Sequence, residues 1–575
     1  MRRFAFCVLL LTLPAVAHAG DKRVDFNLNT IDGKTWSLAK DAKDKKAVVL
    51  VFVGTQCPIN NAYMPRLVEL DKAYRDKGVQ FVAINANHHD TLDTIRKHAK
   101  KYELPFPVLR DEKNRIADQL GAERHPTTIL LDADRTVRYH GRIDDQYGIG
   151  YNRPAPTRRD LANAIDQVLA GKTVTTAKTP VEGCFITKAP RPKAAKAEVT
   201  YAKDVSRILQ NRCQECHRPG QIAPMPLLSY DDASSWAQMI REVVQDRRMP
   251  PWHADPKIGS FANDRRLSDD ERNKLLTWVD AGCPQGDDKD LPTAKKFAEG
   301  WSIGKPDAVF TFKDAVTVPA KSVKGVLPYK WVLIPTNFDE DKWVQAVEAK
   351  PGNHSVVHHI IVYIARSRQK NVDGIGNGLL VAYAPGDLGA TFPPGAAKKL
   401  PKGAVLAFQM HYTPVGSEQV DRSSIGLVFA KEPPKAEVKT RAATQQVFAI
   451  PAFADSHKVT SRTTFAKDTV LYSMFPHMHL RGKDFKFDVV YPDNKRETLL
   501  SVPHYDFGWQ SNYILKTPLR LPAGTRIECT AHFDNSAKNR NNPDPSKAVF
   551  WGEQTWQEMM IGFMDYATVG ADEKK

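Results

Sequence analysis

The chain has 575 residues, which is too long for a single hydrophobic core and predicts about three to four domains. Hydrophobic residues make up 42% of the sequence and charged residues 26%, which excludes a disordered or membrane-embedded protein. The formal net charge is +16, but lysines and arginines are spread along the whole chain, so the charge does not indicate nucleic-acid binding.

Residues 1–19 have the pattern of a secretory signal peptide. Arg2 and Arg3 form a positive start, and residues 4–16 form an apolar run that is too short to span a bilayer. Ala17-His18-Ala19 places small residues where a signal peptidase reads them; an uncleaved anchor is the alternative. No later stretch is apolar enough to cross a membrane. We therefore expect a periplasmic or secreted protein without a transmembrane segment after signal cleavage.

Residues 22–172 alternate between strand-like and helix-like patterns. This alternation predicts an α/β domain with a mostly parallel sheet. The first expected strand is a continuous apolar run, which is typical of a strand buried on both faces. The expected strands are Ala47–Val53, Val79–Asn85 and residues 127–131, and the expected helices are residues 62–77 and 161–169.

Residues 173–199 are rich in Lys, Ala, Thr and Pro and are expected to form a linker. Residues 200–285 have apolar positions at spacings of three and four, which predicts a small all-α domain. Residues 286–304 form a second polar linker.

The segment Cys213-Gln214-Glu215-Cys216-His217 matches the attachment sequence of a c-type haem. Its two thiols would bond covalently to the haem, and His217 would ligate the iron. The alternative is an isolated metal or redox pair of cysteines. Together with the signal peptide and the helical surroundings, the motif predicts one covalently bound haem c.

The sixth ligand of this haem is expected to be Met249, because a thioether raises the haem potential and favours electron transfer. Met225, Met239 and His253 remain alternatives. The segment resembles small cytochrome c domains that carry a Met-Pro-Pro-Trp element, here Met249-Pro250-Pro251-Trp252.

From residue 305 onward, short β-rich runs recur between turns that contain Gly, Pro and Asn. This pattern predicts two all-β sandwiches, at residues 305–435 and 436–570. The expected strands are residues 309–312, 331–334, 359–364, 405–411, 425–429, 469–474 and 485–490.

The C-terminal half contains three histidine groups that can converge on metal ions. His477 and His479 lie two residues apart, so on a strand both rings point to the same face. His358 and His359 are adjacent and would point to opposite faces of a regular strand, so sharing a metal requires a bulge or a strand end. His411 is the third group.

These segments resemble the copper type II, ascorbate-dependent monooxygenases, which include the peptidylglycine hydroxylating and dopamine β-monooxygenases. The resemblance covers residues 305–570 and implies two jelly-roll subdomains and two copper ions. The segments that carry it are His358-His359-Ile360, Gln409-Met410-His411-Tyr412, His477-Met478-His479, Cys529-Thr530-Ala531-His532-Phe533 and Glu558-Met559.

The resemblance also implies a role for each copper ion. The residues that would hold an electron-transfer copper are His358, His359 and His411. The residues that would hold the oxygen-activating copper, and would thus be catalytic, are His477, His479 and Met559. Imidazoles suit both oxidation states of copper, and a thioether favours Cu(I).

One departure from the peptide-amidating members concerns the anchor for the substrate carboxylate. Those members have an Arg and a Tyr where this chain has Phe475 and Phe563. Peptide amidation is therefore not expected, and the pocket is expected to be apolar. The alternative is that both residues are ordinary core of the sandwich.

Residues 51–63 and the later His125-Pro126-Thr127 resemble the thioredoxin-like fold and the redoxin group within it. The resemblance implies that Cys57 lies at a helix N-terminus, which lowers the pKa of a thiol, and that Pro126 is a cis-proline beside it. Asn60 stands where a local partner cysteine would be.

Gly54 stands where peroxidase-type redoxins have a Thr. The candidate redox thiols are Cys57 and Cys184, which would be either a nucleophile and its distant resolving thiol or a static disulfide. A structural or docking role for this domain is the alternative.

The function expected from these parts is a copper-dependent monooxygenase that hydroxylates a C–H bond of a small apolar substrate with O₂. Its electrons would come through the fused haem or from an ascorbate-like reductant, supplied by a partner protein or a small molecule. Two alternatives stay open: a non-enzymatic copper-binding and electron-transfer protein, and a thiol or peroxide redox enzyme centred on Cys57.

Overall fold

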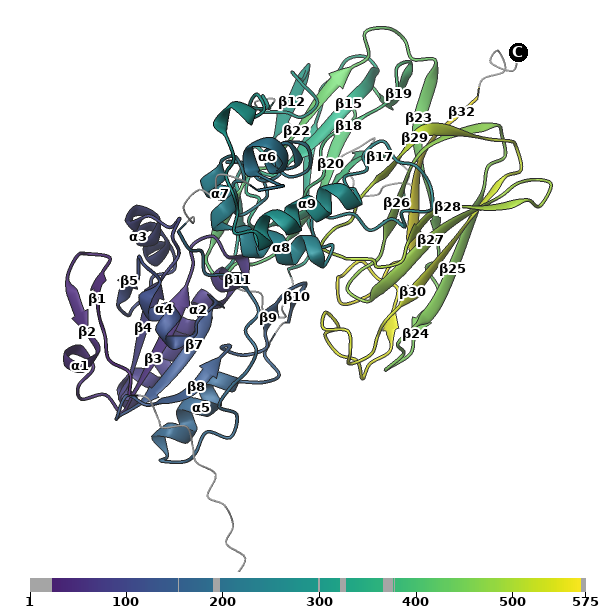
Figure 1. Cartoon of the computed structure of the whole chain (residues 1–575). Coiled ribbons are helices and arrows are strands. Elements are labelled where there is room, and N and C mark those ends of the chain that lie inside the picture. Colours follow the sequence, from purple (N-terminus) through teal and green to yellow (C-terminus); the bar gives the residue numbers. More distant parts are fainter. Residues whose placement is uncertain are drawn as a thin grey trace, which may run out of the picture.

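The computed structural model describes residues 23–153, 155–189, 197–297, 300–320, 327–365, 376 and 378–569. The expected signal peptide lies outside these residues. Among the described helices, none has the length and apolar character that crossing a bilayer requires. Figure 1 shows an N-terminal α/β domain, a group of helices in the middle of the molecule and a large β-sheet-rich remainder.

The N-terminal domain is built around a seven-stranded sheet in the order β2-β1-β5-β4-β3-β7-β8. All residues of β3 are buried, because its alternate side chains pack into hydrophobic clusters on the two opposite faces of the sheet. The strands are β1 (Asn27–Thr30), β2 (Thr35–Ser37), β3 (Ala47–Val53), β4 (Val79–Asn85), β5 (Val108–Arg110), β7 (Thr127–Asp132) and β8 (Val137–Gly141). The helices are α1 (Leu38–Asp41), α2 (Pro58–Tyr74), η1 (Arg75–Lys77), α3 (Leu92–Lys101), α4 (Arg115–Leu120) and α5 (Asp160–Leu169).

The prediction of a mostly parallel sheet is wrong. Among the described strands, β3–β4 and β4–β5 pair in parallel, whereas β1–β2, β1–β5, β3–β7 and β7–β8 are antiparallel. Crossovers through α2 and α3 produce the parallel pairs. Short turns join β1 to β2 and β7 to β8, and a short turn can join only antiparallel neighbours.

Four very short strands lie outside this sheet. They pair as β9 with β10 and as β6 with β11, so the end of the domain returns to the segment before β7. Their bounds are β6 (Arg124–His125), β9 (Tyr147–Gly148), β10 (Tyr151–Asn152) and β11 (Cys184–Phe185).

The middle segment contains the helices that its apolar spacing predicts. They enclose a hydrophobic cluster centred on the fully buried Trp278, whose Nε1 donates a hydrogen bond to the carbonyl of Pro284 at 3.0 Å. The helices are η2 (Tyr201–Val205), α6 (Ser206–Arg212), α7 (Tyr230–Ser235), α8 (Ala237–Gln245), α9 (Asp269–Asp280) and η3 (Asp288–Asp290). The assignment of this segment as a cytochrome c domain stays a prediction.

The remainder of the chain is β-rich, and each of the seven strands expected there is found. Its largest sheet has nine strands and continues through both predicted sandwiches, because β19 pairs with β23. The strands of this sheet are β12 (Ala308–Thr311), β22 (Ser424–Phe429), β15 (Lys342–Lys350), β18 (Ala390–Thr391), β19 (Ala396–Leu400), β23 (Ala436–Thr444), β32 (Ile561–Thr568), β26 (Thr469–His477) and β29 (Tyr513–Leu521).

Two four-stranded sheets and two strand pairs complete this part. The four-stranded sheets are β14 (Lys330–Pro335), β20 (Val405–Tyr412), β16 (Val357–Ala365) and β17 (Leu379–Tyr383), and β25 (His457–Thr464), β30 (Arg526–Phe533), β27 (Gly482–Val490) and β28 (Arg496–Val502). The pairs are β13 (Val316–Val318) with β21 (Gln419–Asp421), and β24 (Ala449–Ile450) with β31 (Val549–Phe550).

The middle helices are joined to the domains on both sides. Trp252 and Phe261, from the segment between α8 and α9, pack in the hydrophobic cluster of the C-terminal strands, where Trp252 contacts Tyr513 edge to face. On the other side, Arg124 of the N-terminal domain forms an ion pair with Glu242 of α8. These contacts hold the helices between the α/β domain and the β-rich part (Figure 1).

Candidate functional site

Cys57 is the N-cap residue of α2, and Pro58 is the first residue of that helix. A helix N-terminus favours negative charge because its first backbone N–H groups lack partners within the helix. Here Sγ of Cys57 accepts a hydrogen bond from the backbone N–H of Asn60 at 3.4 Å, and the side chain is fully buried. The predicted positions of Cys57 at a helix start and of a cis bond before Pro126 are both confirmed.

Cys184 lies on the short strand β11, which brings it next to Cys57. This strand pairs antiparallel with β6, which places Cys184 opposite His125. The backbone N–H of Cys184 then donates a hydrogen bond to Sγ of Cys57 at 3.4 Å, although the two residues are 127 positions apart. The structure therefore brings together the two candidate redox thiols, of which Cys184 is partly exposed and Cys57 is buried.

The two thiols have opposite pKa shifts. Burial by itself would raise the pKa of Cys57, but a hydrogen bond with Cys184 and the charge of His125 outweigh it and hold this pKa well below its usual value. The hydrogen bond to Cys57, together with burial, raises the pKa of Cys184 well above its usual value. The thiolate therefore forms first at Cys57, while Cys184 stays protonated.

A buried polar network beside the thiols was not predicted from the sequence. The thiol of Cys57 contacts the backbone carbonyl of His125 at 3.7 Å, and Nε2 of the His125 ring lies 3.2 Å from Nδ2 and 3.3 Å from Oδ1 of Asn87. Asp90 in turn accepts hydrogen bonds from the side chains of Asn87 and Asn85, at 3.1 and 2.7 Å. The sequence signal that could have indicated this network is the run of polar residues at the end of the apolar strand β4, because strand ends meet at one edge of a sheet.

Gly183 allows β11 to approach the backbone of His125 closely, and this gives a testable prediction. Its φ is +153°, and a Cβ there would lie 2.1 Å from the carbonyl oxygen of His125. Gly183→Ala is expected to push Cys184 away from Cys57 and to slow formation of their disulfide about tenfold or more, since the overlap costs roughly 1–3 kcal/mol. Alkylation and mass mapping over time would measure the rate. Gly171→Ala is the control, because its φ is also positive but nothing lies within 4 Å; equal rates in the two variants would contradict the prediction.

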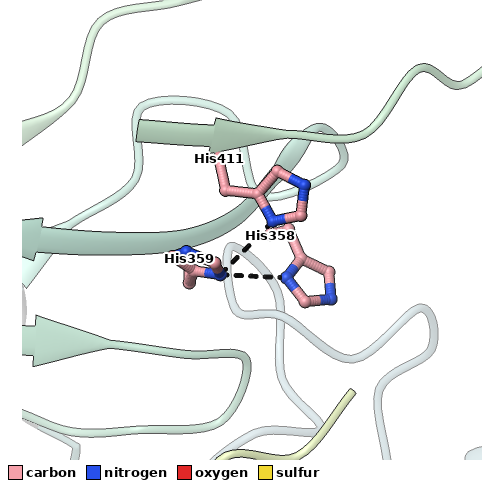
Figure 2. Close-up of side chains that lie close together, drawn as sticks. All are labelled: His358, His359 and His411. Carbon is pink, nitrogen blue, oxygen red and sulfur yellow. Dashed lines mark hydrogen bonds between the residues drawn. The ribbon is translucent and has the colours of Figure 1, made fainter. Parts of the chain in front are cut away.

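A second candidate site is the cluster of His358, His359 and His411, whose ligand atoms all lie within 4.8 Å of one another. Nδ1 of His359 is 3.3 Å from Nδ1 of both other rings, so three ring nitrogens converge on one point (Figure 2). His359 and His411 are opposite each other on β16 and β20. The register of β16 shifts between Val357 and His359, which is the bulge that adjacent histidines require to share a metal.

All three rings are neutral at neutral pH. Burial lowers the pKa of His358 to about 4 and holds the pKa values of His359 and His411 well below the usual value. A neutral imidazole has a free lone pair for a metal, whereas an imidazolium has none. The cluster is therefore chemically suited to hold a metal ion.

The third candidate site lies at the end of β26. The rings of His477 and His479 are 5.2 Å apart, and burial lowers their pKa values to about 4 and about 3. Met559 comes two residues before Ile561, which pairs with His477 in the sheet. Glu558 holds this segment in place, because its carboxylate accepts a hydrogen bond from the backbone N–H of His479 at 2.8 Å.

The loop between β28 and β29 connects the two histidine sites. Phe507 stacks on His358, with ring centroids 4.8 Å apart, and its centroid is 5.9 Å from that of His479. Gln510 of the same loop contacts Nδ1 of His477 at 2.6 Å. This arrangement was not predicted, because neither Phe507 nor Gln510 belongs to a recognisable motif.

Phe475 and Phe563 stack on each other with ring centroids 5.8 Å apart. Both line a cavity of about 210 Å³. The pocket is not apolar throughout, because Lys398 and Asp565, which form an ion pair at 3.0 Å, also line it.

The expected haem-attachment cysteines, Cys213 and Cys216, lie directly after α6. Nδ1 of His217 lies 3.1 Å from the carbonyl oxygen of Met225, and burial lowers the pKa of this histidine. Met249 follows α8, and its backbone N–H donates to the carbonyl of Val243 at 3.1 Å. The assignment of Met249 as sixth ligand stays a prediction.

Comparison with known proteins identifies relatives of the N-terminal domain. Residues 19–140 match the AhpC/TSA family. The thiol-disulfide oxidoreductase ResA of Halalkalibacterium halodurans is 33% identical over 129 residues, which cover 22% of this chain and 68% of that protein. The thioredoxin-like protein YneN of Bacillus subtilis is 39% identical over 120 residues, which cover 21% of this chain and 68% of that protein. The chain thus spans about two thirds of the length of these relatives.

A solved structure of a hypothetical protein from Sinorhizobium meliloti is 32% identical and matches 30% of this chain and 95% of its own, with a TM-score of 0.27.

The relatives correct the main functional prediction, which was a copper-dependent monooxygenase. They are thiol–disulfide oxidoreductases and thioredoxin-like proteins, so they indicate thiol redox chemistry and not hydroxylation with O₂. The monooxygenase prediction relied on ligand types and their order, which describe a metal site without specifying its reaction.

Proposed function

This chain belongs, through its N-terminal domain, to the thioredoxin-like family of the AhpC/TSA and ResA proteins, and we propose that it is a thiol–disulfide oxidoreductase. Its redox pair is Cys57 and Cys184. The observation that carries the proposal is the 3.4 Å hydrogen bond from the backbone of Cys184 to Sγ of Cys57, because it places a second thiol against a thiolate-forming N-cap cysteine. Asn60 removes any local partner for Cys57, so Cys184 takes that role.

The proposed reaction transfers two electrons between this pair and a partner dithiol. A partner thiolate attacks Sγ of Cys184 in the disulfide, since Cys57 is fully buried. The bond between the two sulfurs breaks, and Cys57 leaves as a thiolate. The second partner thiol then displaces Cys184, which takes a proton because its pKa is raised. The partner ends as a disulfide and this chain as a dithiol.

The direction of the pKa shifts favours reduction of the pair. A thiolate of low pKa is a good leaving group, and it stabilises the reduced form of a dithiol. The lowered pKa of Cys57 therefore supports a disulfide that oxidises partner thiols.

The test is equilibration of the full-length protein with glutathione buffers of graded potential, followed by alkylation of free thiols and mass mapping. We expect one disulfide, between Cys57 and Cys184, that opens and closes reversibly. Cys283→Ser is the control, since this cysteine lies in the middle domain and is expected to leave the titration unchanged. Absence of a reversible bond between Cys57 and Cys184 in the wild type would refute the function.

We also propose that the β-rich part binds two copper ions that carry electrons. The convergence of three Nδ1 atoms from His358, His359 and His411 favours this second role. The second ion would be held by His477, His479 and Met559, whose thioether favours Cu(I). When bound, copper supplies reversible one-electron transfer. The protein's own contribution is to keep the imidazoles neutral and to hold the two sites against each other through Phe507.

Copper binding is tested by metal analysis of the full-length protein after loading and removal of weakly bound metal. We expect two copper ions per chain, with zinc as a weaker competitor at the site that includes Met559, because a thioether prefers copper. A preparation that retains neither copper nor zinc would refute this role without affecting the thiol function.

We further propose an exported protein that carries one haem c on Cys213 and Cys216. The geometry of His217 supports ligation, because its Nδ1–H donates to the carbonyl of Met225 and leaves Nε2 available for iron. Met249 is the proposed sixth ligand. Staining for covalent haem after denaturing electrophoresis tests the attachment, and loss of the stain in Cys216→Ala is the expected result.

A further inference from the structure

We infer that the middle helices cover the thiol pair, so that a small thiol compound reaches Cys184 directly, whereas a protein partner reaches it only after the N-terminal domain separates from these helices. This inference rests on the proposed thiol–disulfide function and deepens it, because it specifies the class of partner that the closed arrangement admits. Its basis is a set of contacts between domains around the short strand β11.

The strand that carries the partly exposed thiol lies against the middle helices. β11 consists of Cys184 and Phe185, and both residues pack on the hydrophobic cluster that these helices enclose. The guanidinium of Arg124 lies over the ring of Phe185, 3.7 Å from its centroid, and donates a hydrogen bond to the carbonyl of Gly183 at 2.7 Å. Cys184 is therefore held at an interface between two domains.

Three charged side chains close this interface. The carboxylate of Glu242 on α8 accepts hydrogen bonds from Arg124 of the N-terminal domain and from Arg248 of the middle segment. The side chains of Arg124 and Glu242 are only 20% and 21% exposed, so water and salt screen their attraction incompletely. Because the carboxylate lies between two guanidinium groups, removing its charge would leave two like charges near each other.

Two further contacts hold the N-terminal domain in this position. The ring of His89 lies against that of Trp236, at the start of α8, with centroids 4.8 Å apart, and Trp236 is 3% exposed. Glu182, two residues before Cys184, forms an ion pair with Arg540 of the β-rich part at 2.7 Å. The segment that carries Cys184 is thus joined to both of the other parts of the molecule.

The interface can open without unfolding either domain. The α/β domain has two hydrophobic clusters of its own, and the middle helices enclose another. Domains that meet through a few polar and aromatic contacts move relative to each other. A protein dithiol must bring its surrounding surface up to Sγ of Cys184, whereas a small thiol needs room for one sulfur. The fraction of open molecules therefore limits exchange with a protein and not with a small thiol.

The experiment compares two maleimides on the reduced full-length protein: N-ethylmaleimide and a maleimide joined to a long polyethylene glycol chain. Mass mapping follows the loss of the unmodified peptide that contains Cys184. The ratio of the two rates measures access, because any change in the reactivity of the thiol affects both reagents equally. In the wild type the polymer reagent is expected to react more than about tenfold more slowly, since it modifies only the open form.

In Glu242→Gln, the rate of the polymer reagent relative to N-ethylmaleimide is expected to rise about tenfold, because a hydrogen bond between charged groups changes an equilibrium by about that factor. Asp280→Asn is the matched control. Asp280 pairs with Arg241 of α8 at 2.7 Å, but this ion pair lies within the middle domain, so the ratio is expected to stay unchanged.

Arg540→Gln is the second variant, and a smaller rise is expected because its side chain is 58% exposed and its ion pair is well screened. The double variant with Glu242→Gln is expected to exceed both single variants. Equal rates of the two reagents in the wild type would overturn the inference, as would an unchanged ratio in both Glu242→Gln and the double variant.

These results are separate from the test of the function itself. If the helices proved not to cover Cys184, a reversible disulfide between Cys57 and Cys184 in glutathione buffers would still support the thiol–disulfide function. If the wild type formed no such disulfide, the function would fail, and the maleimide ratios would still show whether the helices cover Cys184.

Discussion

Cys57→Ser is expected to reduce thiol–disulfide exchange to the uncatalysed rate. A serine hydroxyl neither forms a disulfide nor leaves as an anion at neutral pH. Cys184 would then be a single, partly exposed thiol whose pKa falls, because the hydrogen bond to Cys57 is the largest cause of its raised pKa. With oxidised glutathione it is expected to form a stable mixed disulfide, which mass spectrometry would locate at Cys184.

Cys184→Ser provides the matched comparison. It also eliminates turnover, but it leaves Cys57 as a fully buried thiol that oxidised glutathione cannot reach. We therefore expect the adduct in Cys57→Ser and its absence in Cys184→Ser. Equal modification of both variants would show that Cys57 is the sulfur attacked from solution, and would contradict the proposed order of attack. Wild-type exchange rates in either variant would contradict the pair itself.

His411→Ala is expected to weaken copper binding at the three-histidine site by about 10- to 100-fold or more, since loss of a supporting partner alone already has an effect of that size. His411 is the one ligand from β20, and its Nδ1 lies 3.3 Å from that of His359. The two remaining rings both come from β16, so the ion would have no ligand from the opposite strand. Equilibrium dialysis against a chelator of known copper affinity would measure the change.

His457→Ala is the control for this substitution, because His457 lies on β25 of the other sandwich and is expected to leave copper binding unchanged. We expect His411→Ala to retain one copper ion, at the site of His477 and His479. Retention of two ions with unchanged affinity would contradict the assignment of the three-histidine site. Loss of both ions would show that the two sites do not bind independently.

Local sequence patterns predicted the strands well and their directions poorly. Ala47–Val53 is found with the expected bounds, because an uninterrupted apolar run can be satisfied only by burial on both faces. The direction of β7 was not predictable in this way. It depends on the path between β5 and β7, which contains α4 and still brings β7 antiparallel to β3, and either direction leaves the same apolar pattern in the strand.

The arrangement of the candidate metal ligands was also only partly predictable. Two adjacent histidines required a bulge to share a metal, and β16 has one at that point. The contact of Phe507 with rings of both histidine sites had no signal in the sequence. It depends on how a loop of one sandwich packs against the other, which no spacing of ligands expresses.

For the thiol site, the sequence by itself determined that Cys57 begins a helix and that Asn60 leaves it without a local partner. These properties depend on neighbours within a few residues. Only the tertiary structure decided that Cys184 and the backbone of His125 lie against the sulfur of Cys57, and that the pKa of Cys57 is lowered. The reason is physical: strand pairing closes a loop of 127 residues, and the energy of that closure comes from sheet and core contacts distributed over the whole domain.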